Sequence, residues 1–179
     1  MGFEVEHKER FDAAGKLDAD DWLFIPRAQL KPDFALDAAL ADEMVRRFLA
    51  RAAQQRVPPL RIINDARGVW LRAPLGKTAL VLLEPERIVD AQRAETSWRI
   101  AGGFLLAHHV PYGGRFYLGG EWQPDGALKL YSTVRRYPPR VVHWFGGSRG
   151  VAVYNRTQGL AYKQLQEKFL KEMARVVTR

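Results

Sequence analysis

Apolar side chains recur every three or four positions in two segments of the chain, residues 34–55 and residues 157–177. An α-helix has 3.6 residues per turn, so this spacing places the apolar side chains on one face. Charged residues occupy the positions between them in both segments. The pattern predicts two amphipathic helices. In the second one the repeating apolar positions are Ala161, Leu165, Phe169 and Met173.

The expected ends of these helices follow from capping residues. Asp33 can accept the N-cap hydrogen bond of the first helix, and Pro58 with Pro59 ends it. Asn155 with Gln158 is similar to a capping box and precedes the second helix.

Between the helices the period falls to two, which is typical of β-strands. The alternation is clearest at 128–137, where one face carries Leu128, Leu130, Ser132 and Val134. We expect an edge strand at 3–8, loops over 12–33 and 84–94, and at most a short strand at 87–90. The other expected strands are 60–64, 68–72, 78–83, 98–110, 115–122, 128–137, 141–145 and 151–154, the last two joined by a glycine-rich hairpin turn.

Pairs of adjacent glycines interrupt this strand region at 102–103, 113–114, 119–120 and 146–147. If the chain reverses around 111–114, Gly103 falls opposite about Gly120. Two patches without side chains would then lie next to each other. Such a patch either lets the sheet bend or leaves room above it for a ligand.

A helix with one broad apolar face needs an apolar partner, and the antiparallel strands supply the largest one. The predicted fold class is therefore α+β, a curved antiparallel β-sheet packed against a long C-terminal helix, with a further helix near the N-terminus. At 179 residues the chain is long enough to bury a core as a single domain, residues 1–179.

Composition narrows the chemistry. The chain has no cysteine, which excludes disulfides, thiolate metal sites and cysteine nucleophiles. No apolar run approaches the ~20 residues that span a bilayer, and the N-terminus lacks the apolar stretch of a signal peptide, so we expect a cytoplasmic protein. Residues 1–55 hold 8 basic and 11 acidic side chains, whereas residues 56–179 hold 20 and 9, a net charge of +11.

Motifs for catalysis are weak. Residues 146–150 match G-x-S-x-G, but no histidine follows Ser148, and a strand rather than a helix is expected next. Gly76-Lys77-Thr78 lacks the earlier glycine of a P-loop. His108 and His109 are adjacent in an expected strand, so their side chains point to opposite faces. The sequence predicts no cofactor, no metal site and no catalytic constellation, and whether the protein is an enzyme stays open.

The order strand, helix, antiparallel strands and long C-terminal helix, with glycine-interrupted strands and Tyr154-Asn155-Arg156-Thr157-Gln158 leading into the last helix, resembles the START/polyketide-cyclase-like helix-grip superfamily. This resemblance implies a curved sheet that grips the last helix, with an apolar cavity between them. Members mostly bind lipids, sterols or polyketide-like molecules, and some catalyse reactions on them.

We therefore expect a small apolar or aromatic ligand, lipid-like or acid-bearing, between the sheet and the C-terminal helix. His108 and Ser132 could orient its polar group, and Arg135 could meet a carboxylate at the rim. The expected lining residues are Trp98, Ile100, Phe104, His108, Phe116, Leu118, Trp122, Leu130, Ser132, Val134 and Arg135.

Three further hypotheses stay open. The basic region 56–179, in which aromatic residues lie among arginines, could bind nucleic acid or another anionic surface. A cyclase- or hydrolase-like enzyme could use the same cavity, with His108 paired to Glu121 or Asp90. A protein partner could dock on the apolar segment 22–25 or on an exposed sheet edge.

Overall fold

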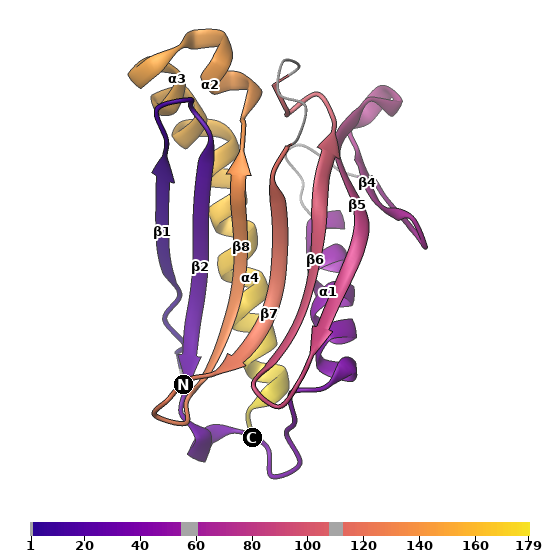
Figure 1. Cartoon of the computed structure of the whole chain (residues 1–179), viewed down its shortest axis with the longest axis vertical. Helices are drawn as coiled ribbons and strands as arrows, with labels where there is room; N and C mark the ends of the chain where they lie inside the picture. Colours follow the sequence, from indigo (N-terminus) through magenta and orange to yellow (C-terminus); the bar gives the residue numbers. More distant parts are fainter. Residues whose placement is uncertain (1, 55–60, 108–112) are drawn as a thin grey trace.

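A computed structural model describes residues 2–54, 61–107 and 113–179, and in them a single antiparallel sheet carries helices on one face (Figure 1). The spatial order of its strands is β1-β2-β8-β7-β6-β5-β4-β3, and each pair of neighbours is antiparallel. The strands are β1 (Glu6–Phe11), β2 (Leu17–Ile25), β3 (Arg61–Asp65), β4 (Gly68–Arg72), β5 (Thr78–Val89), β6 (Arg93–Gly102), β7 (Arg115–Trp122) and β8 (Leu128–Tyr137).

Two long helices cover the same face of this sheet. The C-terminal helix α4 (Leu160–Val177) packs on β2 and β8, and α1 (Ala38–Ala53) packs on β6 and β7 (Figure 1). A π-helical turn, η3 (Asn155–Gly159), joins α4 to α3 (Gly147–Tyr154), so the chain is helical without a break from residue 147 to residue 177. The remaining elements are α2 (Arg140–Phe145) and the 3-10 turns η1 (Arg27–Gln29) and η2 (Pro74–Gly76).

The core forms where the two helices meet the sheet. Phe169 and Met173 of α4 are fully buried. The ring of Phe169 packs edge-on against Phe48 of α1 at 5.6 Å between centroids, and Phe48 lies 4.9 Å from Phe116 of β7. Burial of aromatic rings is a large favourable contribution to folding. The α+β prediction, with a curved antiparallel sheet held against a long C-terminal helix, is confirmed.

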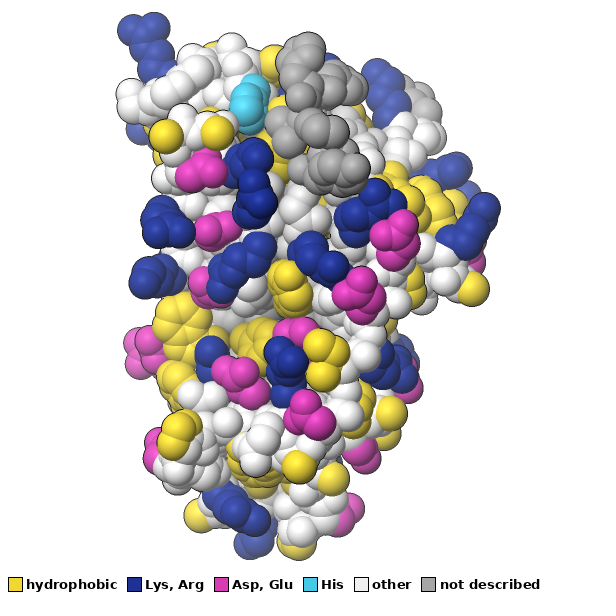
Figure 2. Space-filling view, in the orientation of Figure 1, with side chains coloured by type: hydrophobic (Ala, Val, Ile, Leu, Met, Phe, Trp, Pro, Cys, Tyr) yellow, Lys and Arg dark blue, Asp and Glu magenta, His cyan; other side chains and the backbone are white. Residues whose placement is uncertain are grey.

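The other face of the sheet carries no helix. Along β8 the side chains of Leu128, Leu130, Ser132 and Val134 point to the helices, and Lys129, Tyr131, Thr133 and Arg135 point away from them. Figure 2 shows this helix-free face, on which cationic and acidic side chains alternate with apolar ones.

Several predicted boundaries are wrong. Residues 12–33 are not a loop, because they contain the nine-residue strand β2. Its inward positions are Leu17, Ala19, Asp21, Leu23 and Ile25, and the buried carboxylate at the central one conceals the period of two. The predicted loop 84–94 belongs mostly to β5 and to the start of β6. The edge strand expected at 3–8 lies at Glu6–Phe11.

The predicted hairpin over 141–154 is also wrong, since this segment forms the helices α2 and α3. Gly146 and Gly147, with φ of 67° and 41°, separate the two helices instead of turning two strands. The N-cap of α1 is Asp37, which accepts from the backbone N–H of Leu40, and not Asp33. Asn155 lies inside a continuous helix and caps nothing.

The expected glycine patch does not form. Gly119 and Gly120 lie opposite Glu95 and Ala94, whereas Gly102 pairs with Val81 on the other neighbouring strand. The reason is that β6 begins at Arg93, earlier than expected, and ends at Gly102. The predicted strand residues 108–110 and 60 lie outside the described residues, as do Pro58 and Pro59.

Candidate functional site

A cavity of about 140 Å³ lies between the sheet and the C-terminal helix. Its walls are mostly apolar, and most of its polar lining residues come from the last helical segment, with Tyr137 of β8 as the exception. The described lining residues include Leu17, Phe48, Leu71, Leu80, Leu82, Ile100, Leu105, Phe116, Val134, Tyr137, Tyr154, Gln158, Tyr162, Leu165 and Gln166. None of these side chains carries a charge, so the cavity is suited to a neutral and largely apolar molecule.

Gln166 is the main polar feature of this wall. It is 0% exposed, and neither its amide oxygen nor its amide nitrogen has a hydrogen-bond partner among the described residues. A buried amide that is left unpaired costs about 1–3 kcal/mol. Tyr162 precedes it by four residues, so both side chains emerge from the same face of α4. Gln166 therefore offers one donor and one acceptor group to the cavity.

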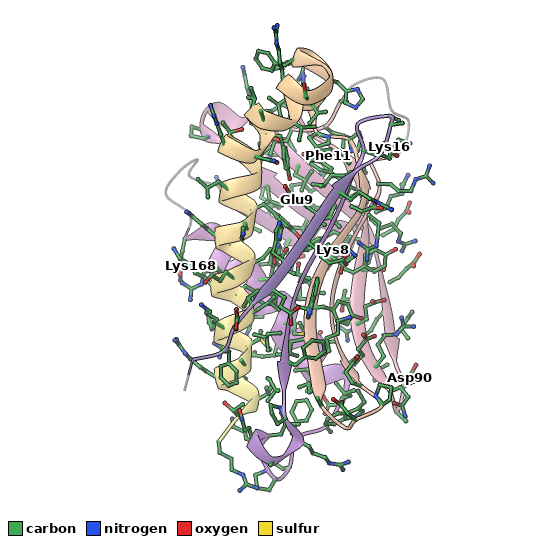
Figure 3. All side chains as sticks on the ribbon, turned by 90° about the vertical axis from the view of Figure 1, so that its left-hand side faces the viewer. Lys8, Glu9, Phe11, Lys16, Asp90 and Lys168 are labelled. Carbon is green, nitrogen blue, oxygen red and sulfur yellow. The ribbon has the colours of Figure 1, made fainter. Side chains whose placement is uncertain are left out.

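A buried polar cluster lies beside Tyr162, between α4 and the strands β1, β2 and β8. The carboxylate of Asp21, 1% exposed, accepts a hydrogen bond of 2.7 Å from Nδ1 of His7. The Tyr162 hydroxyl approaches Asp21 and Ser132, but it does not reach the geometry of a full hydrogen bond with either. Figure 3 shows β1 crossing in front of α4 at this edge of the sheet.

The pKa values in this cluster follow from burial and from the His7–Asp21 contact. Burial raises the pKa of Asp21, and the hydrogen bond from His7 opposes that increase. The hydrogen bond to Asp21 raises the pKa of His7, which also lies 3.3 Å from Oε2 of Glu9. Burial raises the pKa of Tyr162 well above its ordinary value, so its hydroxyl stays protonated and is available as a donor.

The π-helical turn η3 brings Tyr154 and Gln158 to the cavity. Tyr154 is 2% exposed and packs edge-on against Phe11 of β1, with centroids 5.4 Å apart. Its ring lies over Gly159, where a Cβ atom would come within 2.9 Å of a ring carbon. Single π turns inside α-helices occur frequently at functional sites.

The predicted ligand residues divide into those that reach the cavity and those that do not. Ile100, Phe116 and Val134 line it. Trp98, Leu118, Leu130 and Ser132 are buried on the same side of the sheet but do not line it.

The remaining predictions of this set lie elsewhere. Phe104 is 36% exposed, and Trp122 packs against Phe34 at the far end of β7 from Phe116. Arg135 is on the helix-free face, where Asp20 binds it, so its predicted place at the cavity rim is wrong. His108 lies outside the described residues.

Sequence reasoning missed the helical half of the lining. Tyr154, Gln158, Tyr162 and Gln166 recur every four positions, the spacing of one helix face. Gln166 interrupts an otherwise apolar stripe, and that interruption is the signal that could have identified it. The lining residues of β4 and β5 had no comparable signal, because an apolar strand residue is expected in any core.

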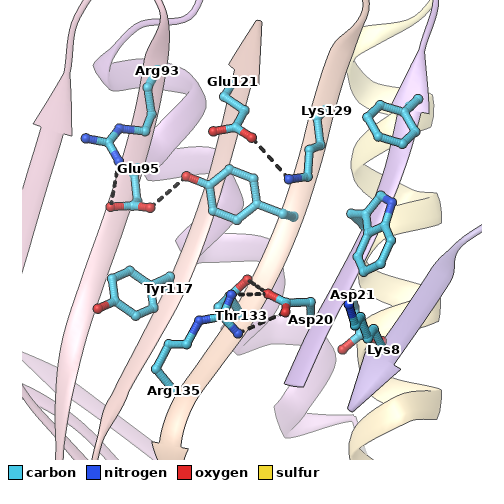
Figure 4. A pocket seen from close by; sticks show the side chains of 13 residues that line it. Lys8, Asp20, Asp21, Arg93, Glu95, Tyr117, Glu121, Lys129, Thr133 and Arg135 are labelled. Carbon is cyan, nitrogen blue, oxygen red and sulfur yellow. Dashed lines mark hydrogen bonds and ion pairs between the residues drawn. The ribbon is translucent and has the colours of Figure 1, made fainter. Parts of the chain in front are cut away.

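A second hollow, of about 590 Å³, lies on the helix-free face (Figure 4). It is lined by Lys8, Asp20, Asp21, Trp22, Phe24, Arg93, Glu95, Tyr117, Glu121, Lys129, Tyr131, Thr133 and Arg135. Three of its cations lie beside carboxylates. Lys129 is 3.1 Å from Glu121. Arg135 binds Asp20 through two nitrogens, and Arg93 lies 3.9 Å from Glu95.

These pairs bear on the nucleic-acid hypothesis. Aromatic and cationic side chains share this face, as a stacking platform for single strands requires. The carboxylates of Asp20, Glu95 and Glu121 lie among them, and they would repel a phosphate backbone. The helix-free face is therefore a poor fit for a polyanion.

The enzyme hypothesis gains no catalytic pair from the described residues. Asp90 accepts hydrogen bonds from the backbone of Gln92 and Arg93 in a turn, and Glu121 lies on the helix-free face, so neither carboxylate lines the cavity. Within the described ranges, no group of His, Asp and Glu side chains could hold a metal ion. No helix in the described part of the chain is long and apolar enough to cross a membrane.

Comparison with known proteins adds little. No family model and no curated protein matches the chain. Among solved structures it is similar to the solution NMR structure of CalU16 from Micromonospora echinospora, at 13% identity and a TM-score of 0.39 over 97% of this chain and 75% of that one. The crystal structure of CalU16 gives 12% identity and a TM-score of 0.32 over 98% and 99%. Scores this low carry no argument about family, ligand or activity.

Proposed function

We propose that this protein binds a small, mostly apolar molecule in the cavity between its sheet and its C-terminal helix. The observation that carries the proposal is Gln166, a fully buried amide that lines the cavity with neither polar end paired among the described residues. A ligand that bonds to this amide would remove the cost of leaving it unpaired.

The cavity volume limits the size of the ligand. An apolar cavity of about 150 Å³ in another protein binds benzene, and the volume here, about 140 Å³, is close to that. A single ring or a short acyl chain fits this space, whereas a sterol does not. Drug-sized ligands occupy sites of roughly 300 Å³ or more.

The charge of the lining limits the polar group of the ligand. Arg135 lies on the opposite face of the sheet, and none of the described lining residues is a cation that could bind a carboxylate of the ligand. Gln166 and the protonated Tyr162 supply neutral partners only. We therefore expect a neutral hydroxyl, carbonyl or amide on the ligand, rather than an acid, because burying an unpaired carboxylate is costly.

Phenol and toluene test this proposal, since they have nearly the same shape and differ in one hydroxyl. Binding is measured by calorimetry and by the rise in melting temperature. Phenol should bind roughly tenfold more tightly than toluene, about the value of one buried hydrogen bond. Gln166→Leu should cancel or invert this preference. Val134→Phe should abolish binding of both molecules by filling the cavity.

Gln164→Leu is the matched control, because Gln164 is exposed on the same helix. It should leave both affinities unchanged. A wild-type protein that binds neither molecule, or a Val134→Phe variant that melts normally and binds both as well as wild type, would rule out the cavity as the binding site.

A further inference from the structure

The segment 140–156, here called the cap, forms the end of the molecule opposite the C-terminus (Figure 1). It comprises α2, α3 and the start of η3. Its side chains at Trp144 and Phe145 are 68% and 56% exposed, the two highest values among the large apolar residues that the structure describes. Large apolar side chains exposed together indicate a contact surface.

The charge of the cap has one sign. Arg140, Arg149 and Arg156 lie within it, and the sequence contains no Asp or Glu from residue 126 to residue 166. The guanidinium of Arg140 lies over the ring of Trp144, 4.5 Å from the ring centroid. An aromatic residue with an arginine at its side is the pair that places a ring at the boundary of a bilayer and the cation at its headgroups.

The backbone holds these side chains at a fixed apex. The two helices meet at Gly146 and Gly147, and Gly150 packs so closely on α2 that a Cβ atom there would lie 2.4 Å from the carbonyl oxygen of Val142. Val142 itself is buried. The apex that carries Trp144 and Phe145 is therefore built on a close backbone contact.

We propose that the cap docks on an anionic lipid surface, with Trp144 and Phe145 in the interfacial region and the three arginines against the lipid headgroups. The chemistry of the surface selects this partner. Single-stranded RNA would need to stack its bases on the exposed rings, but Arg140 already covers a face of the Trp144 ring. An acidic protein would need a matching apolar pocket. The inference does not rest on the cavity, although α3 and η3 also supply cavity residues, so a docked cap would place the cavity near the bilayer.

Vesicle flotation of the full chain tests the proposal. One set of vesicles contains phosphatidylcholine alone, and in the other a third of the lipid is phosphatidylglycerol. We expect binding to the anionic vesicles that weakens as salt rises, and little binding to the neutral ones. Trp144→Ala with Phe145→Ala should reduce binding by roughly tenfold or more, since both rings lose their burial. Arg140→Gln with Arg149→Gln should also reduce it, by roughly 25-fold, at about fivefold per charge.

Matched controls separate the cap from general charge and apolarity. Phe24→Ala removes another exposed ring, and Arg61→Gln with Arg67→Gln removes the same charge from the β3–β4 hairpin. Both should bind vesicles like wild type. Three results would overturn the proposal: no binding to anionic vesicles, equal losses in the controls and the cap variants, or binding of a single-stranded oligonucleotide but not of vesicles. Phenol binding by the same variants shows independently whether the cavity is functional.

Discussion

The hydroxyl of Tyr131 on β8 donates a hydrogen bond of 2.6 Å to the carboxylate of Glu95 on β6, across the intervening strand β7. Gly119 lies opposite both residues in the register of the sheet. A Cβ atom at that position would lie 2.6 Å from the Tyr131 hydroxyl oxygen. The phenol group thus occupies the space that a side chain at 119 would need.

This arrangement predicts the effect of Gly119→Ala. The added methyl group forces the ring away from Glu95, whose side chain is nearly buried and loses its donor. We expect the free energy of unfolding to fall by about 1–3 kcal/mol, measured by urea denaturation. Gly102→Ala is the control, because that strand glycine has only one ordinary contact, at 3.9 Å, and its variant should be nearly neutral.

A double-mutant cycle isolates the cause. Tyr131→Ala removes the ring that a methyl group at 119 would meet, so the Gly119→Ala cost should be smaller in the Tyr131→Ala background than in wild type. Equal costs in the two backgrounds would show that the glycine acts through the backbone and not through Tyr131.

Phe169 should be the most sensitive position of the C-terminal helix. It is 0% exposed and contacts Phe48 of α1, so it joins the two helices to the sheet. Phe169→Ala should lower the free energy of unfolding by about 3–5 kcal/mol. Leu160→Ala on the same helix, at a position 49% exposed, should change it by about 0.5 kcal/mol or less. Similar costs at the two positions would contradict the packing of α4 on the sheet.

Gln166→Leu should stabilise the protein without ligand. The substitution replaces an unpaired buried amide by an apolar side chain of similar size, which removes a penalty of about 1–3 kcal/mol. Thermal and urea unfolding measure this difference, with the exposed Gln164→Leu as the neutral reference. A marked loss of stability in Gln166→Leu would mean that the amide is paired in solution.

His7 should titrate above its ordinary pKa of 6.5, because Asp21 accepts a hydrogen bond from its ring. Since the folded pKa is raised, the stabilisation is fully present below about pH 6.5 and is lost as the pH rises through the folded value. NMR titration gives the pKa, and urea denaturation at several pH values gives the stability. Asp21→Asn should lower the His7 pKa and flatten this pH dependence. A wild-type His7 that titrates at or below 6.5 would contradict the contact.

The parts of the fold that the sequence predicted well are those in which one periodicity persists. The four-residue repeat through Phe169 and Met173, and the alternation along β8, identified the helix, the strand and their buried faces. Prediction failed where a buried polar group or a local backbone conformation overrides the pattern. Asp21 hides the alternation of β2, and Val141–Phe145 is as β-branched and aromatic as a strand, yet Gly146 and Gly147 allow two helices there.

The candidate site was half predictable for a related reason. Ile100, Phe116 and Val134 lie on strands, and an alternating pattern shows which face they share. The same alternation places the side chains of Val134 and Arg135 on opposite faces of β8. Arg135 was nevertheless predicted at the cavity rim, because that position was inferred from its charge alone. The lining residues of α4 depend on the rotation of the helix about its axis over the sheet, which only tertiary packing sets.

The π turn at Asn155–Gly159 sets how far α3 is rotated relative to α4 about their common helix axis. A π turn accommodates one residue more than the α-helical ladder needs. Deleting a single residue there would restore the continuous hydrogen-bond pattern of an α-helix. The deletion would also rotate the helical residues before the turn by about 100° relative to α4. Tyr154 would then lose its contact with Phe11. Trp144 would point in a different direction, while α4 would stay packed on the sheet. The number of residues in this turn therefore sets the orientation of the cap relative to α4.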